Sequence, residues 1–205
     1  MSKFPIIVFE GIEGSGKSFH INKVQQYLKS NRIKYIKLRE PGGSVSSEKI
    51  RNLILNKKSK FNQLTDLFLY MAARNENFHN VIKKNYKKRV ILIDRFIDST
   101  IAYQHYGMGV DIKIINIINK YLLKNIKVNF TFLNVVNKKN LFLRLKMRKS
   151  LNRYDQFNTN FYNKVQNGFL KLSKLNEKKY KIINSNLDIK KNEELIINQV
   201  KKLIK

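Results

Sequence analysis

Hydrophobic positions along this 205-residue chain alternate between short apolar runs and longer stretches in which apolar side chains recur every three or four positions. The apolar runs predict strands at 6–9, 34–38, 90–93, 129–134 and 180–183. The helical spacing predicts helices at 17–30, 46–56, 64–86, 98–104, 111–123, 138–147 and 159–176, with a last helix from about 192. Because parallel neighbouring strands need crossover connections, this alternation predicts an α/β fold whose five-stranded parallel sheet is flanked by helices on both faces.

The pattern contains no internal repeat and no linker, so we expect a single domain over residues 1–205. The hydrophobic content of 42% is enough for a sizeable core. The absence of Cys excludes disulfides, thiolate metal sites and cysteine nucleophiles, and three His leave little for a metal cage. The apolar runs are far shorter than the roughly 20 residues of a membrane span. We therefore expect a soluble, cytoplasmic protein with no membrane partner.

The net charge of +28, from 42 basic and 14 acidic residues, suggests a nucleic-acid partner at first sight. Its make-up favours another cause, because 33 Lys and only 9 Arg occur beside 26 Asn and 25 Ile, the residues that AT-rich codons favour. We therefore expect a solvated lysine surface and no specific nucleic-acid partner. In such a chain each Arg is expected where a planar, bidentate donor is needed.

Residues 11–18 read GIEGSGKS, which matches the pattern G-x-x-x-x-G-K-[ST] of a phosphate-binding loop. An apolar strand precedes the loop and a helix follows it, which is the context that the motif requires. Backbone N–H groups and the helix N-terminus bind phosphate, Lys17 reaches the β and γ phosphates, and the Ser18 hydroxyl binds Mg²⁺. We therefore predict ATP and Mg²⁺ as cofactors, with an ATP site formed by Gly11, Ile12, Glu13, Gly14, Ser15, Gly16, Lys17 and Ser18.

Two further motifs follow strands. Asp94 and Arg95 come directly after the third strand, at the carboxyl edge of the sheet beside the loop. There Asp94 is expected to hold Mg²⁺ through water, and Arg95 to clamp a phosphate with two donors. The turn sequence REPGG at 39–43 follows the second strand and carries Arg39.

Together these motifs resemble the thymidylate kinase family, in its bacterial form, over nearly the whole chain. The segments that carry the resemblance are FEGIEGSGKS at 9–18, REPGG at 39–43, the helix with Arg51, YMAAR at 70–74, DRFIDSTIAYQ at 94–104 and RKSLNRYDQ at 148–156. The resemblance implies the fold of a P-loop nucleoside monophosphate kinase with a short lid at about 148–156. It also implies transfer of the γ-phosphoryl of ATP to dTMP, and a cis peptide bond before Pro41.

The resemblance also implies the contacts of the dTMP phosphate and sugar. Arg39 and Arg95 would bind the acceptor phosphate, with Arg51 near the same region. Glu13 looks like the loop carboxylate that meets the 3′-OH of the acceptor sugar. Tyr103 resembles the ring that leaves no room for a ribose 2′-OH.

The base and the lid are covered by the same resemblance. Tyr70 would stack on thymine and Arg74 would donate to thymine O4, with Thr100 and Gln104 around the base edge. In the lid, Arg148 and Arg153 would lie over ATP. The loop itself supplies no cation beyond Lys17, so we expect Arg148 to act as an arginine finger from the same chain. The expected catalytic residues are Lys17, Arg95, Arg148 and Glu13.

The sequence departs from the family pattern in the lid, where the usual Asp-Arg-x-Glu reads Asn152-Arg153-Tyr154-Asp155, and at Met108, where Arg is frequent. These departures predict a less ordered lid and put any role of the missing Arg in doubt. The family pairs through helices beside the sheet, and we expect a homodimer that uses the long helix with Leu67, Phe68 and Met71. Those residues would serve equally well in the core of one chain.

Three other functions remain open at this stage. A kinase for another nucleoside monophosphate would need a different set of groups at the base edge. A P-loop switch or ATPase would need a residue that positions a water molecule, and would not explain the Arg residues near Arg95. A nucleic-acid-binding protein would rest on the net charge alone.

Overall fold

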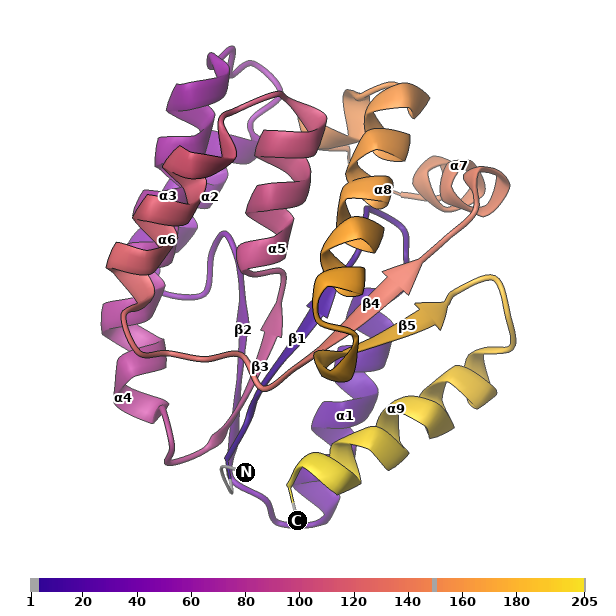
Figure 1. Ribbon diagram of the computed structural model, residues 1–205. Coiled ribbons are helices and arrows are strands. Elements are labelled where there is room, and N and C mark those ends of the chain that lie inside the picture. Colours follow the sequence, from indigo (N-terminus) through magenta and orange to yellow (C-terminus); the bar gives the residue numbers. More distant parts are fainter. Residues whose placement is uncertain (1–3, 149–150, 205) are drawn as a thin grey trace.

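The computed structural model describes residues 4–148 and 151–204. In this part of the chain five strands form one sheet, β1 (Ile6–Glu10), β2 (Tyr35–Arg39), β3 (Val90–Asp94), β4 (Phe130–Val135) and β5 (Tyr180–Asn184). Their order is β2-β3-β1-β4-β5 and every pairing is parallel (Figure 1). The predicted five-stranded parallel sheet is therefore confirmed.

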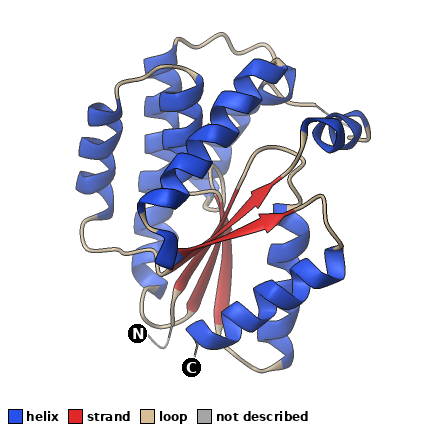
Figure 2. Ribbon diagram, turned by 45° about the vertical axis from the view of Figure 1, so that its right-hand side comes forward, coloured by secondary structure: helices blue, strands red, loops and turns tan. Residues whose placement is uncertain are grey.

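Helices cover both faces of the sheet (Figure 2). One face carries α1 (Lys17–Ser30) and α9 (Ile189–Leu203). The other side carries α2 (Val45–Leu55), α3 (Gln63–Asn77), α4 (Lys83–Asn85), α5 (Ile97–Thr100), α6 (Ile112–Leu123) and α8 (Thr159–Leu175), while α7 (Lys138–Lys146) follows β4. Within the described residues, no helix has both the length and the apolar character needed to cross a membrane.

The central strand β1 is buried along its whole length, and its side chains divide between two cores. Ile7 and Phe9 pack against α1 and α9, whereas Ile6 and Val8 pack on the opposite face. This division follows from the two-residue period of a strand, whose successive side chains point to opposite faces. A strand buried on both faces reads as a continuous apolar run, which is why β1 was easy to predict.

Two helical stretches contain π-helical turns that the sequence pattern did not predict. The stretch expected at 64–86 is one helical run, but η1 (Phe78–Ile82) is π-helical between α3 and α4. The helix expected at 98–104 is α5 followed by the π-helix η2 (Ile101–Gly107). Gly168 of α8 allows η2 to approach closely, since a Cβ there would lie 2.5 Å from the Tyr106 ring. π-helical turns are frequent at functional sites, and η2 carries Tyr103 and Gln104.

The last helix begins at Ile189, three residues before the expected position near 192. The side chain of Asp188 accepts a hydrogen bond from the backbone N–H of Lys191 and caps this helix. An Asp at the N-cap is a helix-start signal that the apolar spacing alone does not contain.

Glu10, the last residue of β1, fixes the helix that follows β3. Its carboxylate accepts hydrogen bonds from the backbone N–H groups of Phe96 (2.8 Å) and Ser99 (3.2 Å) and from the Ser99 hydroxyl. Phe96 is the N-cap of α5 and offers no side-chain acceptor of its own, so Glu10 takes that role from a neighbouring strand. Glu10 is only 1% exposed, and burial, followed by the charge of Asp98, raises its pKa to about 7.

The raised pKa of Glu10 predicts a loss of stability as the pH rises. Between about 4.5 and about 7 the folded state keeps a proton that the unfolded chain releases, so the free energy of unfolding falls through this window and then levels off. Glu10→Gln removes the ionisation and keeps an amide oxygen as acceptor. We expect the free energy of unfolding to fall from pH 4.5 to pH 7.5 by up to about 3 kcal/mol more in the wild type than in the variant, as measured by urea unfolding. An equal fall in both proteins would contradict the raised pKa of Glu10.

Candidate active site

The loop at 11–16 lies between β1 and α1 at the carboxyl edge of the sheet. Gly11 has a φ of 136°, and a Cβ at this position would lie 2.2 Å from the carbonyl oxygen of Asn134 in β4, so no side chain fits. Lys17 folds back over the loop and donates to the carbonyl oxygens of Gly11 (2.9 Å) and Ile12 (2.8 Å). Burial, together with the charge of Arg95, lowers the pKa of Lys17 to about 8, although three carboxylates oppose the shift.

Two residues from distant parts of the chain hold this loop in place. Arg144 of α7 donates to the carbonyl oxygens of Gly14 and Ser185, each at 2.8 Å. The Ser185 hydroxyl donates to the carbonyl oxygen of Ser15 at 2.6 Å. No motif in the sequence marks either contact. The position of Ser185 directly after β5 was a usable signal, because parallel strands bring their carboxyl ends to one edge.

A cavity runs from the loop into the space between α2, α3, η2 and the lid. It brings together most of the side chains that were expected to bind the two substrates and the metal. Of those expected residues its lining contains Glu13, Lys17, Ser18, Arg51, Tyr70, Arg74, Asp94, Arg95, Thr100, Tyr103, Gln104 and Arg148. Glu40, Leu55, Phe96, Ser99, Asn152 and Tyr154 also line it, and none of them had been assigned a contact.

Arg95 lies at the centre of this cavity. It has a φ of 66°, an unusual backbone conformation for a residue with a side chain, and such conformations cluster at functional sites. Its guanidinium donates to Glu13 and to the carbonyl oxygen of Gly11, at 2.8 and 2.9 Å. Glu13 also accepts a hydrogen bond from the Tyr103 hydroxyl. Burial would raise the pKa of Glu13, but the charges of Arg95 and Lys17 outweigh it and lower the pKa.

Arg74 is almost completely buried and holds the inner end of the cavity together. Its Nε donates to Glu40 at 2.8 Å, and the same group of donors reaches Asn119, Thr100 and the carbonyl oxygen of Phe96 at 2.8–2.9 Å. Burial raises the pKa of Glu40, although Arg74 opposes this shift. Arg74 is therefore buried at the cavity with its donors already hydrogen-bonded to protein groups.

Arg39 is placed differently from the expectation. Its side chain is 53% exposed, does not line the cavity, and makes an ion pair with Glu48 of α2 through two guanidinium nitrogens. The expected cluster of Arg39 with Arg95 is therefore not formed in this structure. The turn after Arg39 follows the expectation, because the Glu40–Pro41 peptide bond is cis. Arg51 donates to the Pro41 carbonyl oxygen at 2.7 Å and does face the cavity.

The lid residues separate into two groups. Residues 149–150 of the expected lid lie outside the described part of the chain. Arg148 faces the cavity and makes an ion pair with Asp155 at 2.5 Å, and Asp155 also accepts from the backbone N–H of Asn152. Arg153 does not line the cavity, and instead makes an ion pair with Asp66 of α3. Arg148 is thus the lid arginine that faces the cavity, whereas Arg153 connects the lid to α3.

The departures from the family pattern do not leave the lid without contacts. The shortened carboxylate Asp155 still binds Arg148, and the Asn152 side chain accepts a hydrogen bond from the Tyr154 backbone at 2.8 Å. Tyr154 begins the short 3₁₀ helix η3 (Tyr154–Gln156) and is buried against Tyr70 and Tyr103. The described lid residues 151–156 thus keep hydrogen bonds and an ion pair, and the expectation of a less ordered lid stays a prediction.

Ser18 and Asp94 form a pair that fits a hard cation. The Ser18 hydroxyl lies 3.4 Å from one Asp94 oxygen, and the other oxygen is buried without a hydrogen-bond partner among the described residues. Mg²⁺ takes oxygen ligands and keeps several waters, so this unpartnered oxygen suits it. Among the described residues no group of three or more His, Asp or Glu could hold a metal. The remaining ligands would therefore be water and phosphate oxygens.

A second cavity lies on the other side of the phosphate loop. Its lining consists of Gly16, Phe19, His20, Arg144, Ser185, Leu187, Ile189 and Asn192. His20 is buried here, which lowers its pKa to about 4, so the imidazole is neutral near pH 7. This cavity combines apolar walls with a few polar groups, a composition typical of a site for an organic ring.

Comparison with known proteins decides the family. The family model for thymidylate kinase matches residues 9–196. The chain belongs to the thymidylate kinase family. It is 36% identical to the thymidylate kinase of Sulfurihydrogenibium sp. over 95% of this chain and 96% of that protein, and 38% identical to that of Mycoplasma capricolum over 97% and 93%.

A solved structure agrees with the sequence comparison. The crystal structure of thymidylate kinase from Ehrlichia chaffeensis matches with a TM-score of 0.77 at 31% identity, over 96% of this chain and 98% of that one. A similarity that extends over whole chains at this identity covers the cavity as well as the sheet. The protein is therefore a kinase with the fold that its motifs implied.

Proposed function

We propose that this chain transfers the γ-phosphoryl group of ATP to dTMP and releases ADP and dTDP. The observation that carries the proposal is one continuous cavity that contains Lys17 at one end and Arg74 with Gln104 at the other. Arg95 lines the same cavity, and we assign it to the acceptor phosphate. A nucleoside monophosphate whose base reaches Arg74 would present its phosphate to the loop.

The inner end of the cavity suits thymine. The Oε1 atom of Gln104 is buried and has no hydrogen-bond partner among the described residues, and Gln104 lines the cavity. It is available to accept from the N3–H of thymine, whereas the N3 atom of cytosine is itself an acceptor. An O4 contact from Arg74 would share the Nη2 donors that now reach Thr100 and Phe96. Cytosine, with a 4-amino donor, would leave buried groups unpaired at both positions.

The phosphoryl transfer needs positioning and charge neutralisation. A phosphate monoester is largely ionised near pH 7, with a second pKa of about 6, so an acceptor oxygen needs no strong base. That oxygen bonds to the γ phosphorus while the bond from phosphorus to the bridging oxygen of ADP breaks. Arg95 and Arg51 bind the acceptor phosphate, and Arg39 would join them only after leaving Glu48. Glu13 and Tyr103 flank the sugar, where the carboxylate meets the 3′-OH.

The ATP end is formed by the loop, the lid and the second cavity. Backbone N–H groups at 11–16 and the ammonium of Lys17 bind the phosphates, and the second cavity beside Gly16 receives the base. Ser18 and Asp94 would hold Mg²⁺. When bound, this ion neutralises charge on the β and γ phosphates. Arg148 is the cavity-facing lid cation and contributes a planar donor to the γ-phosphoryl. ATP is a cytoplasmic metabolite, and we extend the proposal to a cytoplasmic location.

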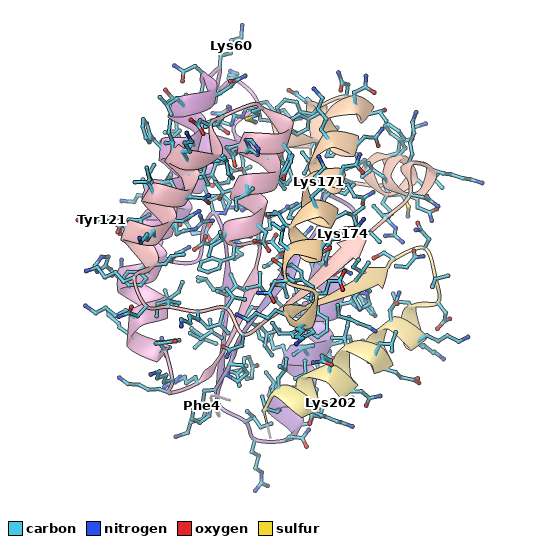
Figure 3. All side chains as sticks on the ribbon, in the orientation of Figure 1. Phe4, Lys60, Tyr121, Lys171, Lys174 and Lys202 are labelled. Atoms are coloured by element: carbon cyan, nitrogen blue, oxygen red, sulfur yellow. The ribbon has the colours of Figure 1, made fainter. Side chains whose placement is uncertain are left out.

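The surface charge does not favour a nucleic-acid function. Three of the exposed lysines, Lys60, Lys171 and Lys202, lie far apart on the molecule (Figure 3). A groove that tracks a nucleic-acid backbone would need them gathered along one path. The spread fits a solvated lysine surface.

An assay across nucleoside monophosphates tests the proposed function. With ATP and Mg²⁺, we expect fast ADP formation with dTMP and at least roughly 1000-fold lower kcat/KM with dCMP, CMP, AMP and GMP, because the inner end of the cavity pairs with N3–H and O4. ADP formation is followed in a coupled assay, and dTDP by chromatography. Equal turnover without any monophosphate would indicate an ATPase instead, and preference for another base would refute the substrate assignment.

The role of Arg148 gives a second prediction for this function. Arg148→Ala should lower kcat by roughly 100-fold, because it removes a donor that acts on charge developing in the transition state. Binding of dTMP should stay nearly unchanged. Arg148→Lys should recover only part of the rate, since an ammonium lacks the fork geometry. Arg89→Ala, at an exposed position outside the cavity, is the matched control. A wild-type kcat in Arg148→Ala would show that Arg148 takes no part in the transfer step.

The expected dimer contact needs a correction. Leu67 and Met71 are buried within one chain and cannot form an outer face, whereas Phe68 is 51% exposed. Other exposed apolar side chains lie beside it, on α3 at Leu64 and on the adjacent α6 at Ile117 and Tyr121. Tyr121 projects outward at the edge of the molecule (Figure 3). We propose a homodimer through this α3–α6 face.

The oligomeric state tests the α3–α6 face. Sedimentation at 0.15 M salt and micromolar concentration should give twice the 24.3 kDa of one chain. Phe68→Glu should shift the protein to the monomer, because a charge is buried without a partner in the interface. Leu175→Glu, at an exposed apolar position at the end of α8, should leave the dimer intact. A wild-type monomer under these conditions would refute the dimer.

A further inference from the structure

Asp66 is a buried carboxylate to which no role has been assigned so far. It lies in the first turn of α3 and is 1% exposed. One of its oxygens accepts from the guanidinium of Arg153, and the other accepts from the Tyr154 hydroxyl and from Nε2 of Gln104, the latter at 3.2 Å. Asp66 therefore joins three residues that come from the lid and from η2.

The contacts around Gln104 decide which way its amide points. Nε2 lies 3.2 Å from the Asp66 carboxylate and 3.3 Å from the Tyr154 hydroxyl oxygen. An ionised carboxylate only accepts hydrogen bonds. Burial, together with Tyr70 and Asp66, raises the pKa of Tyr154, so the hydroxyl stays protonated and donates a hydrogen bond to Asp66. Both neighbours thus present acceptor oxygens to Gln104.

A reversed amide would be unfavourable at this position. Turning the amide by half a rotation would place Oε1 against two oxygens, and it would leave the Nε2 donors without these partners. The cost of such buried, unpaired groups is about 1–3 kcal/mol each. The observed orientation leaves Oε1 unpartnered in a residue that lines the cavity.

We propose that Asp66 is a positioning residue that determines base specificity by fixing the amide orientation of Gln104. The inference rests on the proposed function, because it requires the base to lie against Gln104. With Oε1 directed to the base, a ring N–H is accepted and a ring nitrogen acceptor is rejected. Asp66 thereby selects thymine and uracil over cytosine without touching the base.

Asp66 contacts the lid as well as Gln104, the residue proposed to select the base. Arg153 and Tyr154 belong to the lid, and the Tyr154 ring lies edge-on to Tyr70 and Tyr103, with centroids 6.0 and 5.7 Å apart. The two oxygens of Asp66 accept all of these hydrogen bonds, from Arg153 and Tyr154 in the lid and from the Gln104 amide. A substitution of Asp66 therefore affects both the selection of the base and the packing of the lid against α3.

The test compares kcat/KM for dTMP and dCMP in the full-length enzyme. Asp66→Asn keeps the shape but can turn an NH₂ group toward Gln104, which permits the reversed amide. We expect the preference for dTMP over dCMP to narrow by at least roughly tenfold. Tyr154→Phe removes one of the two acceptors that face Nε2. It should also reduce the preference for dTMP over dCMP, but by a smaller factor than Asp66→Asn. Glu76→Gln, an acid-to-amide change on the same helix outside the cavity, should leave the ratio unchanged.

A second pair of variants separates positioning from a merely structural role. In a Gln104→Ala background there is no amide to orient, so adding Asp66→Asn should leave the dTMP to dCMP ratio of that background unchanged. Equal losses for both substrates in Asp66→Asn and in Tyr154→Phe, with an unchanged ratio, would overturn the inference while the proposed function stands. If the wild type does not phosphorylate dTMP, the proposed function and this inference both fall.

Discussion

The ion pair between Arg95 and Glu13 is the interaction on which the rest of the site depends. Arg95 leaves β3 in a left-handed backbone conformation, which aims its guanidinium across the sheet edge at the loop that follows β1. Glu13 holds it there and also receives the Tyr103 hydroxyl from η2. Three chain segments are thereby joined at the point where the acceptor phosphate would meet ATP.

Buried charges explain why this arrangement favours anionic ligands. Lys17 and Arg95 both donate to the Gly11 carbonyl oxygen, and their mutual repulsion adds to the burial that lowers the pKa of Lys17 to about 8. Phosphate oxygens would replace the carbonyl partners, and their negative charge would raise the pKa of Lys17 toward its ordinary value. The end of the cavity at Arg74 differs, because Arg74 donates there to protein side chains that include the Glu40 carboxylate. In the proposed function, this end would stay fixed while the cations at the other end would exchange carbonyl partners for phosphate.

The sequence predicted those features whose signals are local. The buried strands, the phosphate loop and the Asp94-Arg95 pair were found because a few adjacent residues carry each signal. The ion pair of Asp66 with Arg153 could not be found in this way, because its members are 87 residues apart. The ion pair of Arg39 with Glu48 was likewise not predicted, although these residues are only nine positions apart, because no motif marks Glu48 as a partner. The π-helical turn at 101–107 leaves no mark in the apolar spacing, because it shifts hydrogen bonds by one residue.

Acidic residues are scarce in this chain, and the few that are buried lie in or near the site. Only 14 acidic residues face 42 basic ones, so an acid that serves merely as a surface charge is rarely required. Four of these acids, Glu10, Glu13, Glu40 and Asp66, are buried, and each accepts hydrogen bonds from side chains or backbone at the site. Burying a carboxylate is unfavourable unless donors surround it, so each buried acid marks a cluster of donors. In this lysine-rich chain the buried acids therefore mark ordered clusters of donors in and beside the cavity.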